Sequence, residues 1–381
     1  VVKAFSSSRD SVPSNAKNTR WSPRSIPSDS LVIGYAHDAA KVEEAIKNGV
    51  NVVCWSFLNM VPTPSGKASI KTDLDLSAIR AIRERFNTVL HVAAFGGWNG
   101  PHPHPSPPGV GGKEWCDAFV DFNGQNGHLF DGIDWDLEGH DDRTAPTSLF
   151  AITTLDIMAD FSLEAKTRYG MSVSLAPAES YLDAMAGPES DEEFSLLLNL
   201  PPLAYLNGSD DDRALLENTG FSHAGRQAYA YVLHRAGIDS FDWVSIQLYE
   251  SYSRFLHETT RAEPQPITQV DALLNRVESF RSGYFVNLPD YKRVRIHVPL
   301  SKLVFGVANA WADGKKVVQV DPESLRQAEQ ILQKRYKSGL KGCMYWTIEE
   351  EGRDNVFMSS ALASVFNDTD SMKTPTDSDE L

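Results

Sequence analysis

Short apolar runs alternate with amphipathic segments along most of the chain, from about residue 31 to residue 366. The apolar runs have the length and the β-branched and aromatic content of buried strands, whereas the amphipathic segments repeat their apolar positions at helical spacing. The expected strands are Leu31–Tyr35, Val50–Phe57, Thr88–Ala94, Phe130–Glu138, Met171–Ala176, Trp243–Tyr249, Leu303–Val307 and Gly342–Thr347. The expected helices are Asp38–Lys47, Leu76–Phe86, Glu114–Phe122, Ser148–Arg168, Gly225–Ala236, Thr268–Phe280, Ser324–Tyr336 and Ser359–Val365.

Eight strands, each followed by a helix, predict a parallel (β/α)8 barrel rather than a doubly wound open sheet. We expect the barrel domain to span residues 29–366. It follows a polar, flexible N-terminal arm of residues 1–28 and precedes an acidic C-terminal tail of residues 367–381. In such barrels the active site lies at the carboxyl ends of the strands. Residues that end a strand are therefore the first candidates for chemistry.

Four carboxylates lie within eight residues of the fourth expected strand, from Asp131 to Glu138. Side chains of a strand alternate between its two faces, so Asp134, Asp136 and Glu138 share one face and large apolar residues occupy the other. Like charges about 7 Å apart on a buried face repel one another and cannot all ionise. A solvated acidic edge would lack the apolar residues, and a calcium loop would need flexible, Asn/Gly-rich spacing. We therefore interpret the cluster as catalytic.

Composition and charge restrict the partners of the protein. The 381 residues carry a formal net charge of −15, with an isoelectric point near 5.1, which argues against nucleic acid or an anionic membrane as a partner. No apolar run approaches the length of a membrane span. The cysteines Cys54, Cys116 and Cys343 do not have the spacing of metal ligands. We expect no metal ion and no cofactor, and we expect the protein to act as a monomer.

The last four residues, Ser378 to Leu381, resemble the KDEL-type signal that retains proteins in the endoplasmic reticulum. We therefore expect the protein to enter the secretory pathway and to be retained there through this SDEL sequence. Where the signal is not read, we expect secretion. A signal of this kind is an address for a receptor and does not anchor a chain in a membrane.

The segment from Asp131 to Glu138 reads DGIDWDLE and resembles the DGxDxDxE signature of glycoside hydrolase family 18, the chitinases and their relatives. Other elements of that family are similar to segments at or after the expected strands. They are Ala94–Trp98 (SxGG), Ala176–Glu179 (AP), Gln247–Glu250 (Q/M-x-Y-N/D) and Gly342–Trp346 (GxMxW), with Gly34, Tyr35 and Phe57 fitting strands one and two. The resemblance covers about residues 31–366.

The resemblance implies a retaining hydrolysis in which the substrate supplies the nucleophile, the carbonyl oxygen of its 2-acetamido group. Glu138 is then the general acid, and afterwards the base that activates water. Asp136 orients the acetamido group and supports its developing positive charge, while Asp134 shares a proton with Asp136 so that the two titrate as a unit. Tyr249 hydrogen-bonds the acetamido carbonyl.

The resemblance also implies an apolar floor for the sugar at Trp346, where CH groups pack on an aromatic face. Plainer interpretations remain: Trp346 as barrel core, Tyr249 as a cap of that core, and Trp98 as the cover of a loop. The expected substrate-binding residues are Trp346, Trp98, Tyr35, Gln247 and Gly97, with Asp131 as a residue of the motif. Glu179 is as compatible with a polar rim as with a ligand contact.

Two positions depart from the family pattern. Ala94 stands where serine is usual, and the usual serine supports the inner aspartate through a hydrogen bond that alanine cannot make. We therefore expect the Asp134–Asp136 pair to rely on other donors or on water. Glu250 replaces asparagine or aspartate and places a longer side chain near the site. We expect it to alter which substituents are tolerated beside the scissile bond.

Many family members insert an α+β subdomain between strands seven and eight. Here about 35 residues separate Val307 from Gly342, and one expected helix uses most of them. We expect a barrel without that insertion, and a shallow open cleft that favours endo-acting cleavage. The longest excursion follows strand five, over about residues 181–226, and is expected to form a substrate wall.

The expected function is that of an endo-acting chitinase on β-1,4-linked N-acetylglucosamine, with chitin or chitooligosaccharides as substrate. An endo-β-N-acetylglucosaminidase that cuts the chitobiose core of N-glycans is the alternative, because the same acids serve both reactions. A non-catalytic chitin- or glycan-binding lectin on the same fold is a third hypothesis. Lectin-like relatives typically lose the terminal glutamate of the motif, and Glu138 is present.

Overall fold

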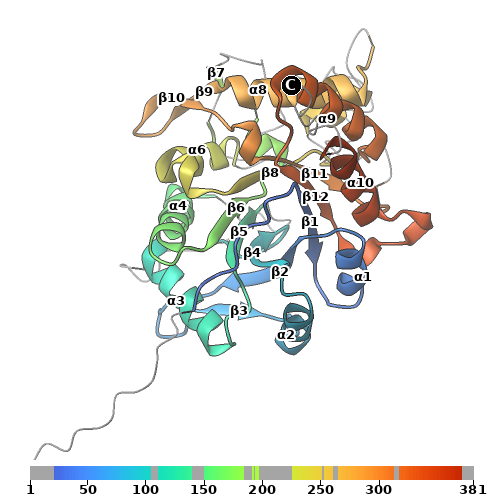
Figure 1. The fold of residues 1–381 in the computed structure, drawn as a ribbon. Helices are drawn as coiled ribbons and strands as arrows, with labels where there is room; N and C mark the ends of the chain where they lie inside the picture. The colour runs from blue at the N-terminus through green and yellow to red at the C-terminus, as the bar shows by residue number, and fades with distance from the viewer. Residues whose placement is uncertain are drawn as a thin grey trace, which may run out of the picture.

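Eight parallel strands close into a barrel that is surrounded by helices (Figure 1). The computed structural model describes residues 21–103, 110–139, 150–183, 191–192, 194–196, 225–250, 253–260, 265–312 and 317–370. The barrel strands are β1 (Leu31–Ala36), β2 (Val52–Met60), β4 (Leu90–Gly97), β5 (Gly132–Leu137), β6 (Ser172–Leu175), β8 (Trp243–Gln247), β11 (Leu303–Ala308) and β12 (Gly342–Trp346). They pair in the order β1-β12-β11-β8-β6-β5-β4-β2, and β2 pairs back with β1. The predicted (β/α)8 barrel is confirmed.

The expected helices are also present, with ends that differ by a few residues. They are α1 (Val42–Lys47), α2 (Leu76–Arg85), α3 (Gly112–Gln125), α4 (Ile152–Thr167), α6 (Ala228–Ala236), α8 (Gln269–Ser282), α9 (Pro322–Tyr336) and α10 (Met358–Asp370). The predicted domain boundary at residue 366 lies inside α10. Residues 371–381, with the SDEL sequence, lie outside the described residues. Within the described part of the chain, no helix has the length and apolar character of a membrane span.

The barrel has two apolar layers, and the alternation along β5 divides its side chains between them. Ile133, Trp135 and Leu137 belong to the large layer between the strands and the helices. A smaller apolar cluster fills the inside of the barrel; it includes Tyr35, Cys54, Ala94, Trp243 and Met344. Asp134, Asp136 and Glu138 have the opposite parity and point into that interior, as the sequence predicts.

A second, small sheet was not predicted. It is formed by β7 (Asp191–Glu192), β9 (Tyr284–Leu288) and β10 (Lys292–Ile296), and it lies beside α6 and α8 at one edge of the barrel (Figure 1). Its β9–β10 hairpin alternates buried and exposed residues, which is typical of a half-exposed pair and produces a weak apolar signal. β3 (Ile70–Thr72) adds an antiparallel edge to β2. Between β11 and β12, the described residues hold α9 and no strand, which agrees with the predicted lack of an insertion.

The described part of the predicted arm packs at the amino-terminal end of the barrel, where Ile26 contacts the inner apolar cluster and Arg24 contacts Asp131. Asp131 is fully buried and forms a two-point ion pair with Arg83 of α2, with 2.7 Å between Arg83 Nη2 and Asp131 Oδ1. It also accepts from the backbone N–H groups of Arg24 (3.0 Å) and His91 (3.1 Å). The Arg24 guanidinium donates to the carbonyls of Phe86 and Val89. Asp131 therefore joins the arm, α2 and the start of β5, at the opposite end of that strand from Glu138.

Candidate active site

Asp134 is held from two sides inside the barrel. Its Oδ1 accepts a hydrogen bond from Ser174 of β6 at 2.5 Å, and its Oδ2 accepts one from the Tyr35 hydroxyl of β1. Burial raises the pKa of Asp134 to about 6, although the hydrogen bonds from Ser174 and Tyr35 act in the opposite direction. The prediction that donors other than residue 94 support this aspartate is thus confirmed.

Asp136 and Glu138 meet at one amide, the side chain of Gln247. Gln247 Nε2 lies 2.7 Å from Asp136 Oδ1, 3.3 Å from Glu138 Oε1 and 2.8 Å from the Ala176 carbonyl oxygen. Burial, and then the charges of Glu138 and Asp134, raise the pKa of Asp136 well above its usual value. Burial also raises the pKa of Glu138, against the hydrogen bonds that its carboxylate accepts. Burial therefore favours the protonated form of each of these two carboxyl groups relative to an exposed carboxylate.

Glu250 adds a fourth carboxyl group to the cluster. It follows Tyr249 just after β8, and its side chain is partly buried beside Glu138. Burial and the charge of Glu138 raise the pKa of Glu250 well above its usual value. Burial, followed by the charges of Asp136, Glu138 and Glu250, likewise raises the pKa of Tyr249. These effects place Tyr249 and Glu250 in the same electrostatic environment as the acids of β5.

Backbone contacts fix the end of β5 where Glu138 emerges. Gly96 of β4 has φ +120°, and a Cβ at this position would meet the backbone of Asp136, so only glycine permits this close approach. The Tyr229 hydroxyl donates to the Leu137 carbonyl at 2.9 Å. His102 Nε2 lies 2.7 Å from the Glu138 carbonyl oxygen. Three separate segments therefore hold the main chain around the acid.

Aromatic rings gather around Trp346 at the end of β12. The Trp346 ring lies 5.3 Å from Tyr35, 5.1 Å from His37 and 5.7 Å from Phe57, measured between ring centroids. Trp311, after β11, donates from Nε1 to the Trp346 carbonyl at 2.6 Å. Its ring packs edge-on against Tyr249. Trp346 is partly exposed, so these rings form a supported apolar surface beside the acids.

The remaining residues that the sequence predicted for the site differ in their exposure and in their distance from the acids. Trp98 follows β4, has 40 % of its surface exposed and lies against Gly139, directly after Glu138. Gly97 has φ +75°, and the Phe57 ring fills the space that a side chain would need. Tyr35 was predicted as a wall of the sugar site, but it is almost fully buried, and its hydroxyl is used by Asp134. Asp131 lies at the far end of the barrel and supports the fold.

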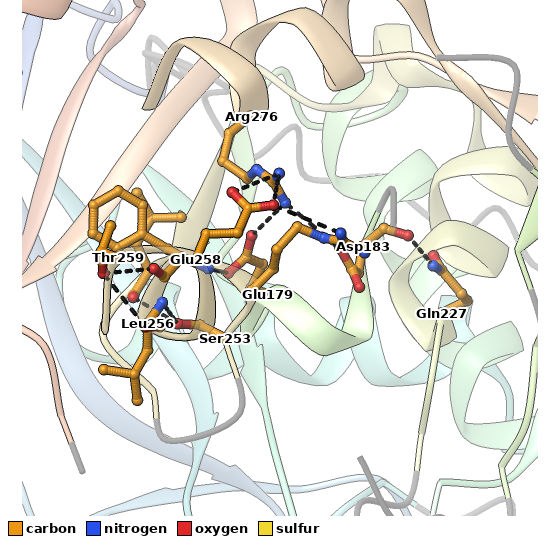
Figure 2. Close-up of polar contacts among 11 residues, drawn as sticks. Glu179, Asp183, Gln227, Ser253, Leu256, Glu258, Thr259 and Arg276 are labelled. Atoms are coloured by element: carbon orange, nitrogen blue, oxygen red, sulfur yellow. Dashed lines mark hydrogen bonds and ion pairs between the residues drawn. The ribbon is translucent and has the colours of Figure 1, made fainter. Parts of the chain in front are cut away.

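Glu179 is neither a polar rim residue nor exposed to a ligand. It is buried in an ion-pair network behind the site, where Arg276 of α8 reaches between Glu179 and Glu258 (Figure 2). Glu258 belongs to α7 (Arg254–Thr260). Glu179 Oε1 lies 3.3 Å from Arg276 Nη1, and Glu179 Oε2 accepts from the Phe255 backbone N–H at 2.9 Å. The network ties the segment after β6 to the two helices after β8.

We expect the network to make the stability of the fold depend on pH. Burial, only partly offset by Arg276, raises the pKa of Glu179 to about 7. A carboxyl group whose pKa is raised by folding contributes stability that is fully present below its ordinary pKa of about 4.5. That contribution is lost as the pH rises through about 7.

We expect Glu179→Gln to flatten the pH dependence of the free energy of unfolding between pH 5 and 8 by up to about 3 kcal/mol, since a shift of one pKa unit corresponds to about 1.4 kcal/mol. Urea titrations of both proteins at pH 5 and pH 8 measure the difference. An equally steep decline in the variant would show that Glu179 does not titrate in this range.

Several residues of the site escaped the sequence interpretation. Ser174 contacts Asp134, and His102 contacts the backbone of Glu138. Tyr229 contacts the backbone of Leu137, and Trp311 contacts the backbone of Trp346 and the ring of Tyr249. Gln247 is more central than a site wall. A signal existed for Ser174, which lies two residues before Ala176 and therefore faces the barrel interior with it. Among the described residues, no group of three or more His, Cys, Asp or Glu side chains is arranged so that it could hold a metal ion. Most of the excursion expected over about residues 181–226 lies outside the described residues, namely 184–190, 193 and 197–224, so the structure does not describe the expected substrate wall.

No family model matches the sequence, and no curated protein is similar to it in sequence. Solved structures are similar over most of the chain. The Legionella pneumophila ChiA C-terminal domain has a TM-score of 0.57 at 16% identity, over 88% of this chain and 98% of that one. A GH18 chitinase from Pseudoalteromonas aurantia has a TM-score of 0.48 at 15% identity, over 88% of this chain and 100% of that one. Active domain 2 of a chitinase from Pyrococcus furiosus has a TM-score of 0.49 at 12% identity, over 93% of this chain and 99% of that one.

At these identities the likeness concerns the fold. The likeness to the ChiA C-terminal domain extends over 98% of that chain, so it includes the complete barrel and not a shared fragment. We conclude that this chain has the barrel fold of the Legionella pneumophila ChiA C-terminal domain.

Proposed function

We propose that the protein hydrolyses β-1,4 linkages next to N-acetylglucosamine, as an endo-acting chitinase with a retaining, substrate-assisted mechanism. The observation that carries the proposal is the joint contact of Gln247 with Asp136 and Glu138 at the carboxyl end of β5. Burial of the carboxyl cluster raises the pKa of Glu138, which favours the protonated form that acid catalysis of glycoside cleavage requires.

In the proposed reaction, Glu138 donates its proton to the glycosidic oxygen. The acetamido carbonyl oxygen of the sugar attacks its own anomeric carbon as the C–O bond breaks, and a cyclic oxazolinium intermediate forms. Glu138, now a carboxylate, removes a proton from water. That water attacks the anomeric carbon from the face that the leaving group vacated, which opens the ring and restores both the acetamido group and the protonated Glu138.

Asp136 and Tyr249 serve the acetamido group in this proposal. Asp136 accepts a hydrogen bond from the N–H of the acetamido group and stabilises the positive charge of the intermediate. Tyr249 donates a hydrogen bond to the carbonyl oxygen of the same group. Asp134 precedes Asp136 by two residues on the same face of β5, and its state of protonation modulates the charge that Asp136 carries. The raised pKa values of Asp134 and Asp136 support a shared charge, because two buried carboxylates so close together do not both ionise near neutral pH.

Trp346 forms the floor of the sugar site in this proposal, and Trp98 contributes a flanking surface. The partial exposure of Trp346 and the 40 % exposure of Trp98 support these roles, since aromatic faces bind sugar rings when solvent can reach them. The lack of a strand between β11 and β12 in the described residues supports an open cleft and therefore internal cleavage of a chain.

The test measures hydrolysis of chitooligosaccharides, polymeric chitin and a high-mannose glycopeptide by the same preparation. Release of short oligosaccharides from chitin supports the chitinase. Cleavage of the glycopeptide alone overturns it in favour of an endo-β-N-acetylglucosaminidase. Binding of chitotriose without hydrolysis of any of the three would overturn both in favour of a lectin.

In this mechanism Gln247 influences the pH at which the rate falls on the basic side of the pH–rate profile, because it contacts the general acid Glu138. Its amide N–H stabilises the Glu138 carboxylate and lowers the pKa of Glu138, so the loss of this donor raises that pKa. We expect Gln247→Met to move the basic limb of kcat/KM upward by about half a pH unit to one unit. Gln333→Met, the same change on the outer helix α9, is expected to leave the limb in place. An unmoved limb in Gln247→Met would contradict the role of this contact.

A further inference from the structure

Asp134 has an in-register neighbour on each side in the barrel sheet. Ala94 of β4 pairs with it on one side and Ser174 of β6 on the other. In-register residues of parallel strands project to the same face with their backbones about 4.8 Å apart. Either neighbour is thus placed to put a hydroxyl group on the Asp134 carboxylate. In this chain, β4 presents a methyl group and β6 presents the hydroxyl.

The contact from Ser174 is short, and the oxygen that receives it is buried. Ser174 Oγ lies 2.5 Å from Asp134 Oδ1, and both side chains are almost completely shielded from solvent. Tyr35 occupies the other carboxylate oxygen. Without Ser174, Oδ1 would face the Ala94 methyl group and the apolar interior of the barrel. A buried carboxylate oxygen without a donor is costly, and the carboxyl group responds by retaining its proton.

We propose that Ser174 is a positioning residue for the reaction, and that from β6 it supplies the hydrogen bond that Ala94 cannot supply from β4. It acts through Asp134 and does not touch the substrate. The inference rests on the proposed function, because it assumes that the Asp134–Asp136 pair must carry negative charge while the acetamido group becomes positive. The hydroxyl keeps that charge available at mildly acidic pH.

A purely structural hydroxyl would behave differently. Ser174 Oγ also lies 3.4 Å from the Ile133 carbonyl oxygen, a contact typical of serine in a sheet. Ser172, two residues earlier on the same strand and on the same face, makes only a comparable contact, 3.4 Å from the Asp131 carbonyl oxygen. Ser172→Ala is therefore a matched control for the loss of a buried hydroxyl from β6.

The experiment compares the pH dependence of kcat/KM for Ser174→Ala, Ser172→Ala and the double variant Ala94→Ser/Ser174→Ala. We expect the acid limb to move upward by about one pH unit in Ser174→Ala, so that kcat/KM below the limb falls about tenfold while the plateau changes little. The double variant moves the limb back toward its original position, because a hydroxyl returns to Asp134 from the other strand. Ser172→Ala leaves the limb unmoved.

An unshifted limb in Ser174→Ala, or a shifted limb that the double variant does not restore, overturns the inference. If Ser174→Ala is too unstable to assay, Ser174→Cys takes its place, since it keeps the volume and donates only weakly. The pKa of Asp134, followed by NMR of the protein labelled with ¹³C at aspartate carboxyl carbons, is expected to rise in Ser174→Ala and to fall again in the double variant. This readout does not need turnover. An inactive wild type therefore refutes the proposed function, whereas an unchanged Asp134 titration refutes the role of Ser174.

Discussion

Replacing Glu138 with glutamine is expected to lower kcat/KM on chitooligosaccharides by about 10³-fold or more. Glutamine keeps the volume and the hydrogen-bonding oxygen of Glu138, but its amide protons are not acidic enough to be transferred to the leaving group. General acid catalysis alone contributes about 10²- to 10⁴-fold, and Glu138 also acts as the base in the second step of the proposed mechanism. The loss is expected in kcat, with the affinity for chitotriose preserved, because the surrounding contacts remain.

The measurement combines steady-state rates with chitotriose titration calorimetry on wild type and Glu138→Gln. The matched control is Glu329→Gln, which removes a buried carboxylate from the outer helix α9, away from the barrel interior. We expect that control to retain the wild-type rate. Near-normal rates in Glu138→Gln would refute the acid assignment, since no other change in the protein accompanies the substitution.

Asp131→Ala is expected to destabilise the fold by about 3–5 kcal/mol, while the folded protein keeps most of the proposed activity. The substitution leaves the Arg83 guanidinium without its buried partner, and it removes the acceptor of two backbone N–H groups. Removing one member of a buried ion pair typically costs this much, because the remaining charge stays desolvated. The loss is a large share of the total stability of a domain, which is typically about 5–15 kcal/mol.

Urea unfolding followed by tryptophan fluorescence measures this loss. Asp191→Ala serves as the control, because its ion pair with Arg293 is exposed on both sides and is expected to contribute about 1 kcal/mol or less. Rates are compared per folded molecule. A variant with wild-type stability and a collapsed rate would place Asp131 in the chemistry rather than in the fold.

Asp131 and Glu138 belong to the same eight-residue motif, yet the two expected results differ in kind. The motif spans the length of one barrel strand. Its first residue therefore lies at the amino-terminal end, where the arm and α2 meet, and its last lies at the carboxyl end, where substrate enters in the proposed function. A motif read only as a set of active-site residues would merge these two roles.

The sequence alone was sufficient to predict those features that depend on the geometry of a single strand or helix. The period of two along β5 places Asp134, Asp136 and Glu138 on one face and Ile133, Trp135 and Leu137 on the other, and the structure has this division. The repeated strand–helix pattern likewise predicts the barrel. Both results follow from local backbone geometry, which dictates the period of a strand or a helix without reference to the rest of the chain.

The partners of those acids were decided only by the tertiary structure. Gln247 lies 109 residues from Glu138 and Ser174 lies 40 residues from Asp134, and each becomes a hydrogen-bond partner through the order and register of the barrel strands. The buried network of Glu179 and Arg276 depends in the same way on how loops after β6 and β8 pack together. Pattern along the chain determines which face a residue occupies, whereas strand register and loop packing determine which residue it meets there.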